Sequence, residues 1–429
     1  MIAILGSLLL VLLLAAGMPV ALAMAVSGVA GLYAVGGLDL VMGMVRSSTL
    51  SSVSSYELIT IPMFILMAEF IIIARIADEL FDATAVWVGR TPGGLGVATV
   101  LAGAMFGAIS GSSTASAATL SSTSLPAMMR QGYSLRTAGA LVAITGTLAI
   151  LVPPSIALVI YGIVADVSIG KLLIAGVIPG LLVAGVLCMI VVGMSLYRPD
   201  RMPPGRPRRW GEKIAVLKVT LPMLILFGAV TGVLYAGIAT PTEAAAVGAL
   251  AAMILASVQR RLTLRGVAQA LVNAARISCM IAFIILGAHI FGYFFTLTQA
   301  TNTVVAWVGG LDIHPYVVML VILIIYLILG CFLDQVAILI LTVPVILPIV
   351  TGLGFDPIWF GVLVVMAAEI GMITPPMGLN VFVVARYTGR SVHEIFAGIM
   401  PFFCILLTLI VILGLVPEII LWLPGRMSN

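Results

Sequence analysis

The sequence predicts an all-α polytopic membrane protein built from two inverted structural repeats. Three observations predict this fold class. The 429 residues are 62% hydrophobic and only 8% charged, whereas a soluble globular chain is usually about one quarter charged. Apolar segments of helix length recur along the whole chain. Proline, glycine and polar breaks in the first half also recur 222 residues later.

The composition narrows the function classes. The net charge of +4 is small and gives no information about nucleic acid. The high hydropathy makes the lipid bilayer an expected partner, and no nucleic-acid partner is expected. The four cysteines lie far apart in apolar runs and fit small buried side chains better than metal ligands or disulfides. The sequence contains no pairing of a histidine with a carboxylate, no nucleotide-binding loop and no metal-ligand spacing. It therefore predicts neither an enzyme nor an organic cofactor.

Residues 1–196 are predicted to form the first repeat. The first apolar segment lacks a basic n-region and runs straight into a second one, so it is expected to be a retained helix and not a signal peptide. Residues 75–90 are charged and amphipathic, which suits a helix lying in the membrane interface. The helical segments are expected at 2–16, 19–36, 57–74, 75–90, 136–165 and 170–196, with a polar loop at 46–55 and a break at Pro153-Pro154.

The stretch at about 94–129 is apolar at both ends and polar in the middle, where residues 107–119 read GAISGSSTASAAT. Each half has about 16 residues, short of the roughly 20 that a full span needs. This pattern predicts a re-entrant helical hairpin with the Ser-rich stretch at its tip. Hydroxyls and free carbonyls there would replace the water around an ion or a carboxylate. A small-residue face for helix packing is the alternative use of such a stretch.

A linker at 197–218 holds five arginines, two lysines and four prolines, so it is expected in the cytoplasm. Residues 219–429 are predicted to form the second repeat. A second hairpin is expected at about 316–350, because a polar break interrupts the apolar run at 330–335. The other segments are expected at 219–237, 240–258, 277–297, 300–312, 357–385 (broken at Pro375-Pro376) and 394–423.

An offset of 222 residues aligns the two halves without gaps over 101–179 and 323–401. It pairs residues that set backbone breaks: Leu125-Pro126 with Leu347-Pro348, Gly132 with Gly354, Pro153-Pro154 with Pro375-Pro376, Gly176 with Gly398, and Pro179 with Pro401. Flanking charges indicate opposite orientations. Arginines flank the first hairpin, whereas no Lys or Arg occurs between Arg276 and Arg386, around the second. The first hairpin is therefore expected to open to the cytoplasm and the second to the outside. Inverted repeats with broken helices are typical of secondary transporters.

The two hairpin tips and the two broken helices are expected to meet near the bilayer midplane, where irregular backbone persists only if it is buried or lines a cavity. Freed carbonyls suit Na⁺, and half-helix N-termini suit an anionic substrate. Asp334 is the only carboxylate at either tip, and a carboxylate there is costly and usually functional. The alternative for Asp334 is a structural hydrogen bond to hairpin backbone. Glu369, just before the second Pro-Pro pair, is a further candidate.

Several motifs resemble the large membrane (M) subunit of TRAP transporters, the tripartite ATP-independent periplasmic carriers. They are SGSSTASAA at 110–118, LVPPS at 151–155, GCFLDQVA at 330–337, LTVPVILPI at 341–349 and GMITPPMGLNVFV at 371–383. The resemblance implies an elevator-type, Na⁺-coupled carrier in a bacterial inner membrane that imports organic acids of the sialic acid or C4-dicarboxylate class. It also implies two partners: a periplasmic substrate-binding protein (P) and a small four-helix membrane subunit (Q). Because this chain starts with the M-like part, Q is expected to be a separate chain.

The resemblance further implies where ligands bind. One Na⁺ site would use Ser110 and Ser112 with backbone of Ala149, Val152 and Pro153. Its counterpart would use Gly330 and Asp334 with Gly371, Thr374 and Met377. The offset pairs Ala149 with Gly371 and Val152 with Thr374, but it pairs Ser112 with Asp334, so the two tips are not chemically equivalent. Expected substrate-facing groups are Ser113, Thr114 and Asn380.

Two other functions stay open at the level of the sequence. One is a stand-alone Na⁺/dicarboxylate carrier with similar hairpins, which would work without a binding protein. The other is a structural or channel-like subunit of a membrane enzyme complex. That function needs a relay of buried Lys, Glu and His, and the sequence has almost none.

The charge pattern yields a topological prediction. Both termini and the loop near Asp356 are expected outside, and the linker near Arg206 inside. Single cysteines introduced beside these two positions should react with an impermeant thiol reagent from opposite sides of the membrane. Labelling of both from the same side would contradict the inverted repeat.

Overall fold

The computed structural model describes residues 2–200, 202–203, 209–310 and 313–427. Within these ranges the regular elements are all helices. They are α1 (Ile2–Ala15), α2 (Val20–Val53), η1 (Tyr56–Ile59), α3 (Thr60–Ile73), α4 (Ile76–Val88), α5 (Gly94–Ser110), α6 (Ser113–Arg130), α7 (Leu135–Leu151), α8 (Ile156–Ala165), α9 (Ile169–Ala175), α10 (Val177–Tyr197), α11 (Trp210–Tyr235), α12 (Pro241–Val258), α13 (Leu264–Leu297), α14 (Ala300–Gly309), α15 (Pro315–Gly330), α16 (Gln335–Gly352), α17 (Pro357–Gly371), α18 (Leu379–Thr388), α19 (Val392–Leu415), α20 (Glu418–Leu421) and η2 (Pro424–Arg426).

The prediction of an all-α polytopic membrane protein is confirmed. Among the described residues, seven helices are long and apolar enough to cross a membrane, or up to nine if each of two bent helix pairs counts as one span. Large apolar side chains such as Leu181, Ile225 and Val247 are exposed on the outer faces of these helices. Lipid covers such side chains in a membrane, so their exposure agrees with the fold class.

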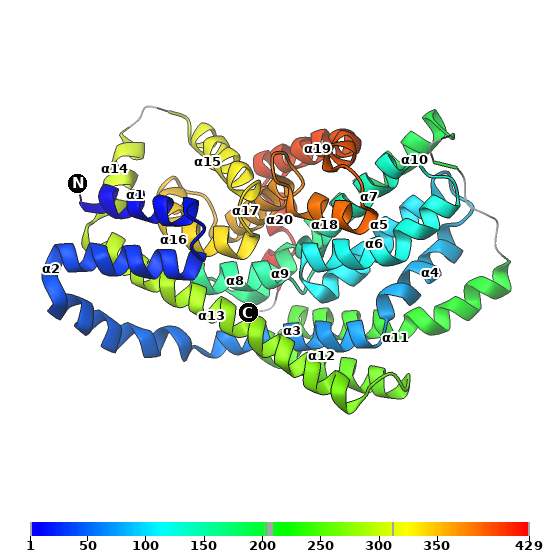
Figure 1. Ribbon diagram of the computed structural model, residues 1–429, viewed down its shortest axis with the longest axis horizontal. Coiled ribbons are helices and arrows are strands. Elements are labelled where there is room, and N and C mark those ends of the chain that lie inside the picture. The colour runs from blue at the N-terminus through cyan, green and yellow to red at the C-terminus, as the bar shows by residue number, and fades with distance from the viewer. Residues whose placement is uncertain (1, 201, 204–208, 311–312, 428–429) are drawn as a thin grey trace.

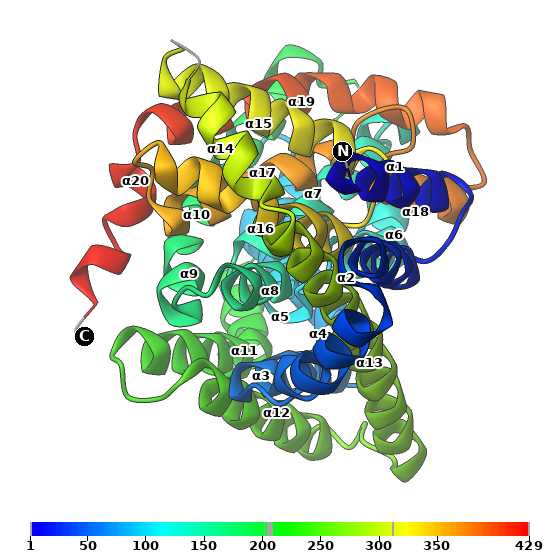
Figure 2. The same ribbon diagram turned by 90° about the vertical axis from the view of Figure 1, so that its left-hand side faces the viewer.

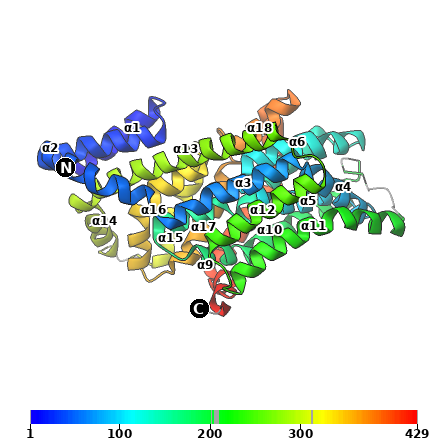
Figure 3. The same ribbon diagram turned by 90° about the horizontal axis from the view of Figure 1, so that it is seen from below.

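The helices form two groups. In what we call the scaffold group, α2 and α3 pack along α13 and α12, while α1 lies on α2 and α11 on α12. These helices make a long band along one side of the molecule (Figures 1 and 3). In the hairpin group, α5 and α6 pack on α7, α15 packs on α17, and α16 on α8. The groups meet where α3 contacts α5 and α8, and where α13 contacts α16.

The helix bounds repeat at the 222-residue offset found in the sequence. The return helices of the two hairpins, α6 and α16, correspond residue for residue in their first and last positions. The helices that follow, α7 and α17, also begin at equivalent positions. The hairpins and the helices that follow them thus come in the same order in both halves, and the inverted orientation of the second half stays a prediction.

Both long helices that carry a Pro-Pro pair are broken, as the sequence predicts. α7 and α8 are bent by 44° across residues 152–155, and the Ser155 side chain accepts the Leu158 N–H at 3.2 Å and starts the second piece. In the second half α17 stops at Gly371 and α18 starts at Leu379. Proline has no N–H to donate, which is why the helical ladder stops at these points.

The base of the first hairpin is fixed by a buried tyrosine in the connection between α6 and α7. The Tyr133 hydroxyl accepts the Gly96 N–H at 3.3 Å, and the same N–H also donates to the Gly93 carbonyl at 2.8 Å, a three-centre hydrogen bond of the kind common at helix ends. Burial raises the pKa of the Tyr133 phenol to about 12. The contact ties the connection between α6 and α7 to the start of α5.

Several expected boundaries are wrong. The polar loop expected at 46–55 is helical through Val53, because α2 resumes after a break with non-helical torsions at Gly36 and Gly37. Serine has a lower helix propensity than alanine or leucine, but this preference is weak and tertiary context overrides it. α13 begins at Leu264, not near 277, and α11 begins at Trp210, inside the expected linker, whose residues 201 and 204–208 lie outside the described ranges. The last expected span ends at Leu415, before Pro417. The span expected at 170–196 agrees with the apolar segment Ile169–Tyr197, which is long enough to cross a membrane and is divided into α9 and α10 at Gly176.

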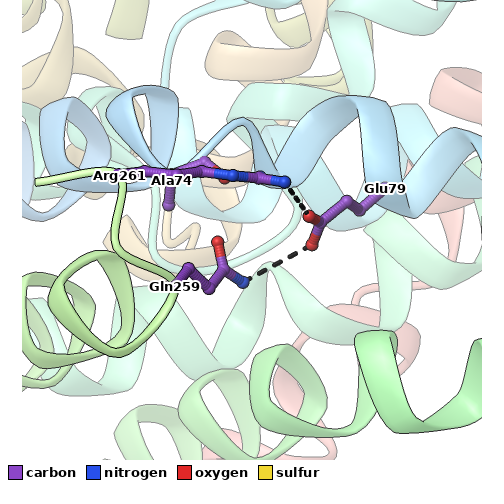
Figure 4. Close-up of polar contacts among 4 residues, drawn as sticks. All are labelled: Ala74, Glu79, Gln259 and Arg261. Atoms are coloured by element: carbon purple, nitrogen blue, oxygen red, sulfur yellow. Dashed lines mark hydrogen bonds and ion pairs between the residues drawn. The ribbon is translucent and has the colours of Figure 1, made fainter.

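One polar cluster ties the α3–α4 junction to the connection between α12 and α13 (Figure 4). The Arg261 guanidinium forms an ion pair with Glu79 at 2.7 Å and donates to the Ala74 carbonyl, which ends α3. Gln259 donates to the other Glu79 oxygen at 3.5 Å. The guanidinium group has several N–H donors in one plane, so it can bind a carboxylate and the C-terminal carbonyl of a helix at the same time.

We predict that Arg261→Ala destabilises the protein by about 1–3 kcal/mol, because it leaves Glu79 and the Ala74 carbonyl without their charged donor. Thermal unfolding of the purified chain would measure the loss. The neighbouring exposed Arg265 lies outside the cluster, so Arg265→Ala serves as the control. Equal effects of the two variants would show that the cluster contributes nothing specific.

Candidate functional site

A cavity of about 300 Å³ lies between the scaffold group and both hairpin tips. Residues 110–115 of the first tip and 334–336 of the second line one side, together with residues of α7 and α8 beside the first helix break. The opposite side is lined by α3 and α13, including Glu69 and Met280. Both tips therefore line one cavity, as expected, whereas only the first of the two helix breaks contributes to its described lining. The site also contains a scaffold wall that the sequence did not predict.

The lining of this cavity carries negative charge. Glu69 and Asp334 are its carboxylates, and none of its described lining residues is Lys, Arg or His. Glu69 is held in place by α13, since the Asn273 side chain donates to its Oε2 at 3.1 Å. The sequence offered one signal for Glu69, a lone carboxylate in an apolar segment.

The first tip is a tight turn between α5 and α6. Gly111 has φ +57° and an added Cβ there would lie 3.2 Å from the Ile156 nitrogen, so the turn requires glycine both for its torsions and for its contact with α8. Ser112 caps α6 by accepting the Ala115 N–H at 3.4 Å. The Ser110 hydroxyl shares a hydrogen bond of 2.8 Å with Ser116 across the turn.

The second tip uses the same device with a different residue. Asp334 caps α16 and accepts the Val336 N–H at 3.2 Å. Ser112 and Asp334 occupy equivalent positions at the 222-residue offset. They differ in charge, but each caps the return helix of its hairpin. The same exchange recurs at the next helix, where Ser134 caps α7 and Asp356 caps α17. The alternative for Asp334, a hydrogen bond to hairpin backbone, is thus correct, and its carboxylate also lines the cavity.

Each tip lies against its own broken helix through glycine. An added Cβ on Gly107 would lie 2.8 Å from the Ala149 nitrogen, and one on Gly330 would lie 2.9 Å from the Gly371 Cα and collide with the Ala368 carbonyl. The structure thus packs α5, which ends at Ser110, against α7 through Gly107 and Ala149, and it brings Gly330 close to Gly371. Val152 and Pro153 are buried at the first break. Thr374 donates to the Ile370 carbonyl at 2.6 Å, and Met377 is 47% exposed.

The expected substrate-facing residues divide into two sets. Ser113 and Thr114 line the cavity. Asn380 is fully buried and is absent from the described cavity lining, which places it behind the tips. The sequence prediction missed Gln335, a lining residue that the offset pairs with Ser113.

We predict that Gly330→Ala pushes the second hairpin away from α17 and costs about 1–3 kcal/mol of stability, the usual cost of overpacking. Gly292 on α13 has open space around its Cβ position, so Gly292→Ala is the matched control and should be neutral or slightly stabilising. Thermal unfolding of both variants would measure the difference. A neutral Gly330→Ala would mean that the second tip is not held by this contact.

Known proteins place this architecture in a family. The sequence matches the family model of the tripartite ATP-independent periplasmic transporter, DctM component, over residues 7–419. The C4-dicarboxylate TRAP transporter large permease protein DctM of Pseudomonas aeruginosa is 37% identical over 373 residues, which cover 86% of this chain and 86% of that protein. The sialic acid TRAP transporter large permease protein SiaM of Vibrio cholerae is 31% identical and covers 96% of each chain. The ectoine TRAP transporter large permease protein TeaC of Halomonas elongata is 30% identical, also over 96% of each.

The fold is similar to that of a solved structure, the YdaH transporter of Alcanivorax borkumensis, with a TM-score of 0.63 over 88% of this chain and 89% of that chain. At 13% identity this likeness shows the fold alone. The assignment rests on the family match and on the relatives. The relatives are transport permeases and not enzymes. The chain belongs to the DctM family of tripartite ATP-independent periplasmic transporters and is a multi-pass transport protein of the bacterial inner membrane.

Proposed function

We propose that this chain is the membrane-embedded subunit that carries an organic acid into the cell together with Na⁺. The observation that carries the proposal is the cavity between the fixed band of α3 and α13 and the two hairpin tips. A substrate in that cavity touches both groups of helices. Movement of one group against the other would then transfer it across the membrane.

The tips offer ligands for Na⁺. Hard cations take oxygen ligands, and the first tip supplies the Ser110 and Ser112 hydroxyls next to backbone freed at the α7–α8 break. The second tip supplies the Asp334 carboxylate and backbone of Gly330, next to Gly371 and Thr374 at the α17–α18 break. Asp334 uses Oδ2 to cap α16, which leaves a second oxygen for an ion.

The charge of the cavity gives a physical reason for coupling. The N-termini of α6 and α16 face the cavity and favour an anionic group. Glu69 and Asp334 disfavour the same group, and no basic side chain among the described lining residues offsets them. An organic acid would therefore bind well only after cations have neutralised part of this charge. The relatives are named as transporters of C4-dicarboxylates and of sialic acid, so we propose an organic acid of one of these two classes as the substrate.

An elevator motion of the hairpin group fits the arrangement of cavities. A second cavity of about 630 Å³ lies between the same groups and is lined by Thr60, Gly162 and His289. Ile65, Ile156 and Ile281 of the same three helices line the first cavity. Both cavities are therefore lined by α3, α8 and α13, at different points along these helices (Figure 2 shows α13 passing α3). Movement of the tips along these helices would expose the substrate to each side in turn.

The partners follow from the tripartite family. We propose that a periplasmic binding protein delivers the substrate and that a small four-helix membrane subunit contacts the scaffold group, through helices such as α12 that carry an exposed apolar face. The helices of the scaffold would stay fixed while the hairpin group moves. Full transport by the chain alone would instead favour the stand-alone carrier.

We predict that uptake in proteoliposomes containing all three components follows a Na⁺ gradient, and that Asp334→Asn abolishes transport or its Na⁺ dependence. Asparagine is as good a helix cap as aspartate, so this variant removes the charge and keeps α16 in place. Asp356→Asn removes the charge from an equivalent cap outside the cavity and is the control, expected to transport normally. Uptake driven fully by a pH gradient in Na⁺-free buffer would refute Na⁺ coupling.

A further inference from the structure

A buried polar cluster lies behind the two tips, on one face of α17. Gln335, the first residue of α16, donates to the Val365 carbonyl at 3.0 Å. Ser113, the first residue of α6, directs its hydroxyl at the Met372 sulfur at 3.9 Å. Glu369 lies one turn from each of these α17 positions on the same face. The starts of both return helices thus converge on one carboxylate.

Asn380 joins the cluster from the far side of the Pro-Pro break. Its backbone N–H donates to the Met372 carbonyl at 3.3 Å, and the Met372 N–H donates to the Glu369 carbonyl at 3.1 Å. A Cβ added to Gly146 would lie 3.4 Å from the side-chain nitrogen of Asn380 and 2.8 Å from the Ser113 carbonyl oxygen. Both groups therefore lie beside Gly146.

The cluster has too many hydrogen-bond acceptors for its donors. Glu369 is 1% exposed, Asn380 0% and Gln335 2%. Both Glu369 oxygens, the Asn380 oxygen and the Gln335 oxygen lack a partner among the described residues, whereas the Asn380 nitrogen is the one unpartnered donor of these three side chains. Unpaired buried acceptors around a carboxylate cost free energy. A bound cation would satisfy several of them at once.

We propose that Glu369, Asn380 and Ser113 hold a monovalent cation, Na⁺ in the cell, at a third site behind both tips. The site rests on the Na⁺ coupling proposed above and is separate from the tip sites. Ala368 and Gly371 face Gly330, whereas Glu369 faces the return helices on another side of α17. Because its ligands come from α6, α17 and α18, the site is complete only when both halves of the hairpin group are assembled around it.

The first repeat has no equivalent site. The offset places Thr147 opposite Glu369 and Leu158 opposite Asn380. Thr147 is satisfied within its own helix, since its hydroxyl donates to the Ile144 carbonyl at 2.7 Å. The protein would therefore bind one ion more than its two-fold repeat predicts.

The test is to count ions. Equilibrium binding of radioactive Na⁺ to the purified full-length chain in lipid nanodiscs should show one Na⁺ fewer per chain for Glu369→Gln than for the unchanged protein. Thr147→Val, at the equivalent position, should leave the number unchanged. Asn380→Leu should weaken the affinity for one of the bound Na⁺ ions roughly 10-fold, the effect expected when a group at a metal site is lost.

Thermal unfolding supplies a readout that needs no transport. Without Na⁺, the melting temperature of Glu369→Gln should equal or exceed that of the unchanged protein, because the unpaired buried carboxyl group is gone. Added Na⁺ should raise the melting temperature of this variant less than that of the unchanged protein. If Glu369→Gln does not fold, Glu369→Asp replaces it and should keep the ion count with weaker affinity. An unchanged count and affinity in the Glu369→Gln protein would overturn the third site alone. No Na⁺ binding by the unchanged protein would overturn the proposed coupling as well.

Discussion

The interaction on which this structure depends is the capping of the helices that begin at the two hairpin tips and at the first helix break. A backbone N–H with no partner costs several kcal/mol in hydrocarbon, and each broken or re-entrant helix creates such groups. Ser112 and Ser155 satisfy them in the first half, and Asp334 does so in the second. Once a side chain has closed a helix start, the remaining polar atoms of the tip are free to face a ligand.

Glycine sets how closely these capped helices approach their neighbours. Gly330 and Gly371 contact each other through backbone, and so do Gly107 and Ala149. Such contacts leave carbonyls of the broken helices near the tip hydroxyls with no side chain between them. Packing and ligand geometry thus come from the same residues, and a methyl group at Gly330 would affect both.

The exchange of serine for aspartate makes the two repeats differ in charge while they keep one backbone. Asp334 adds a carboxylate at one tip only, and Glu369 adds a second behind it, opposite Thr147 of the first repeat. With Glu69 on the scaffold, three carboxylates line or adjoin the cavity between the two groups of helices. Cations that neutralise them would connect ion binding in the second half to substrate binding between both halves.

The sequence by itself determined the fold class, the two polar tips, the two Pro-Pro breaks and the offset that relates them, because each is a local interruption of an apolar run. It also determined the family, through motifs at those same breaks. Only the tertiary structure decided that α3 and α13 close the cavity, that Asn380 is buried behind the tips, and that Glu369 lies between Gln335 and Ser113. These outcomes depend on which face of each helix packs inward, and apolar segments that face lipid on one side and protein on the other carry too little periodicity to reveal it. The extension of α2 through its serines was likewise decided by context, since helix propensity differs among ordinary residues by only about 0.7 kcal/mol.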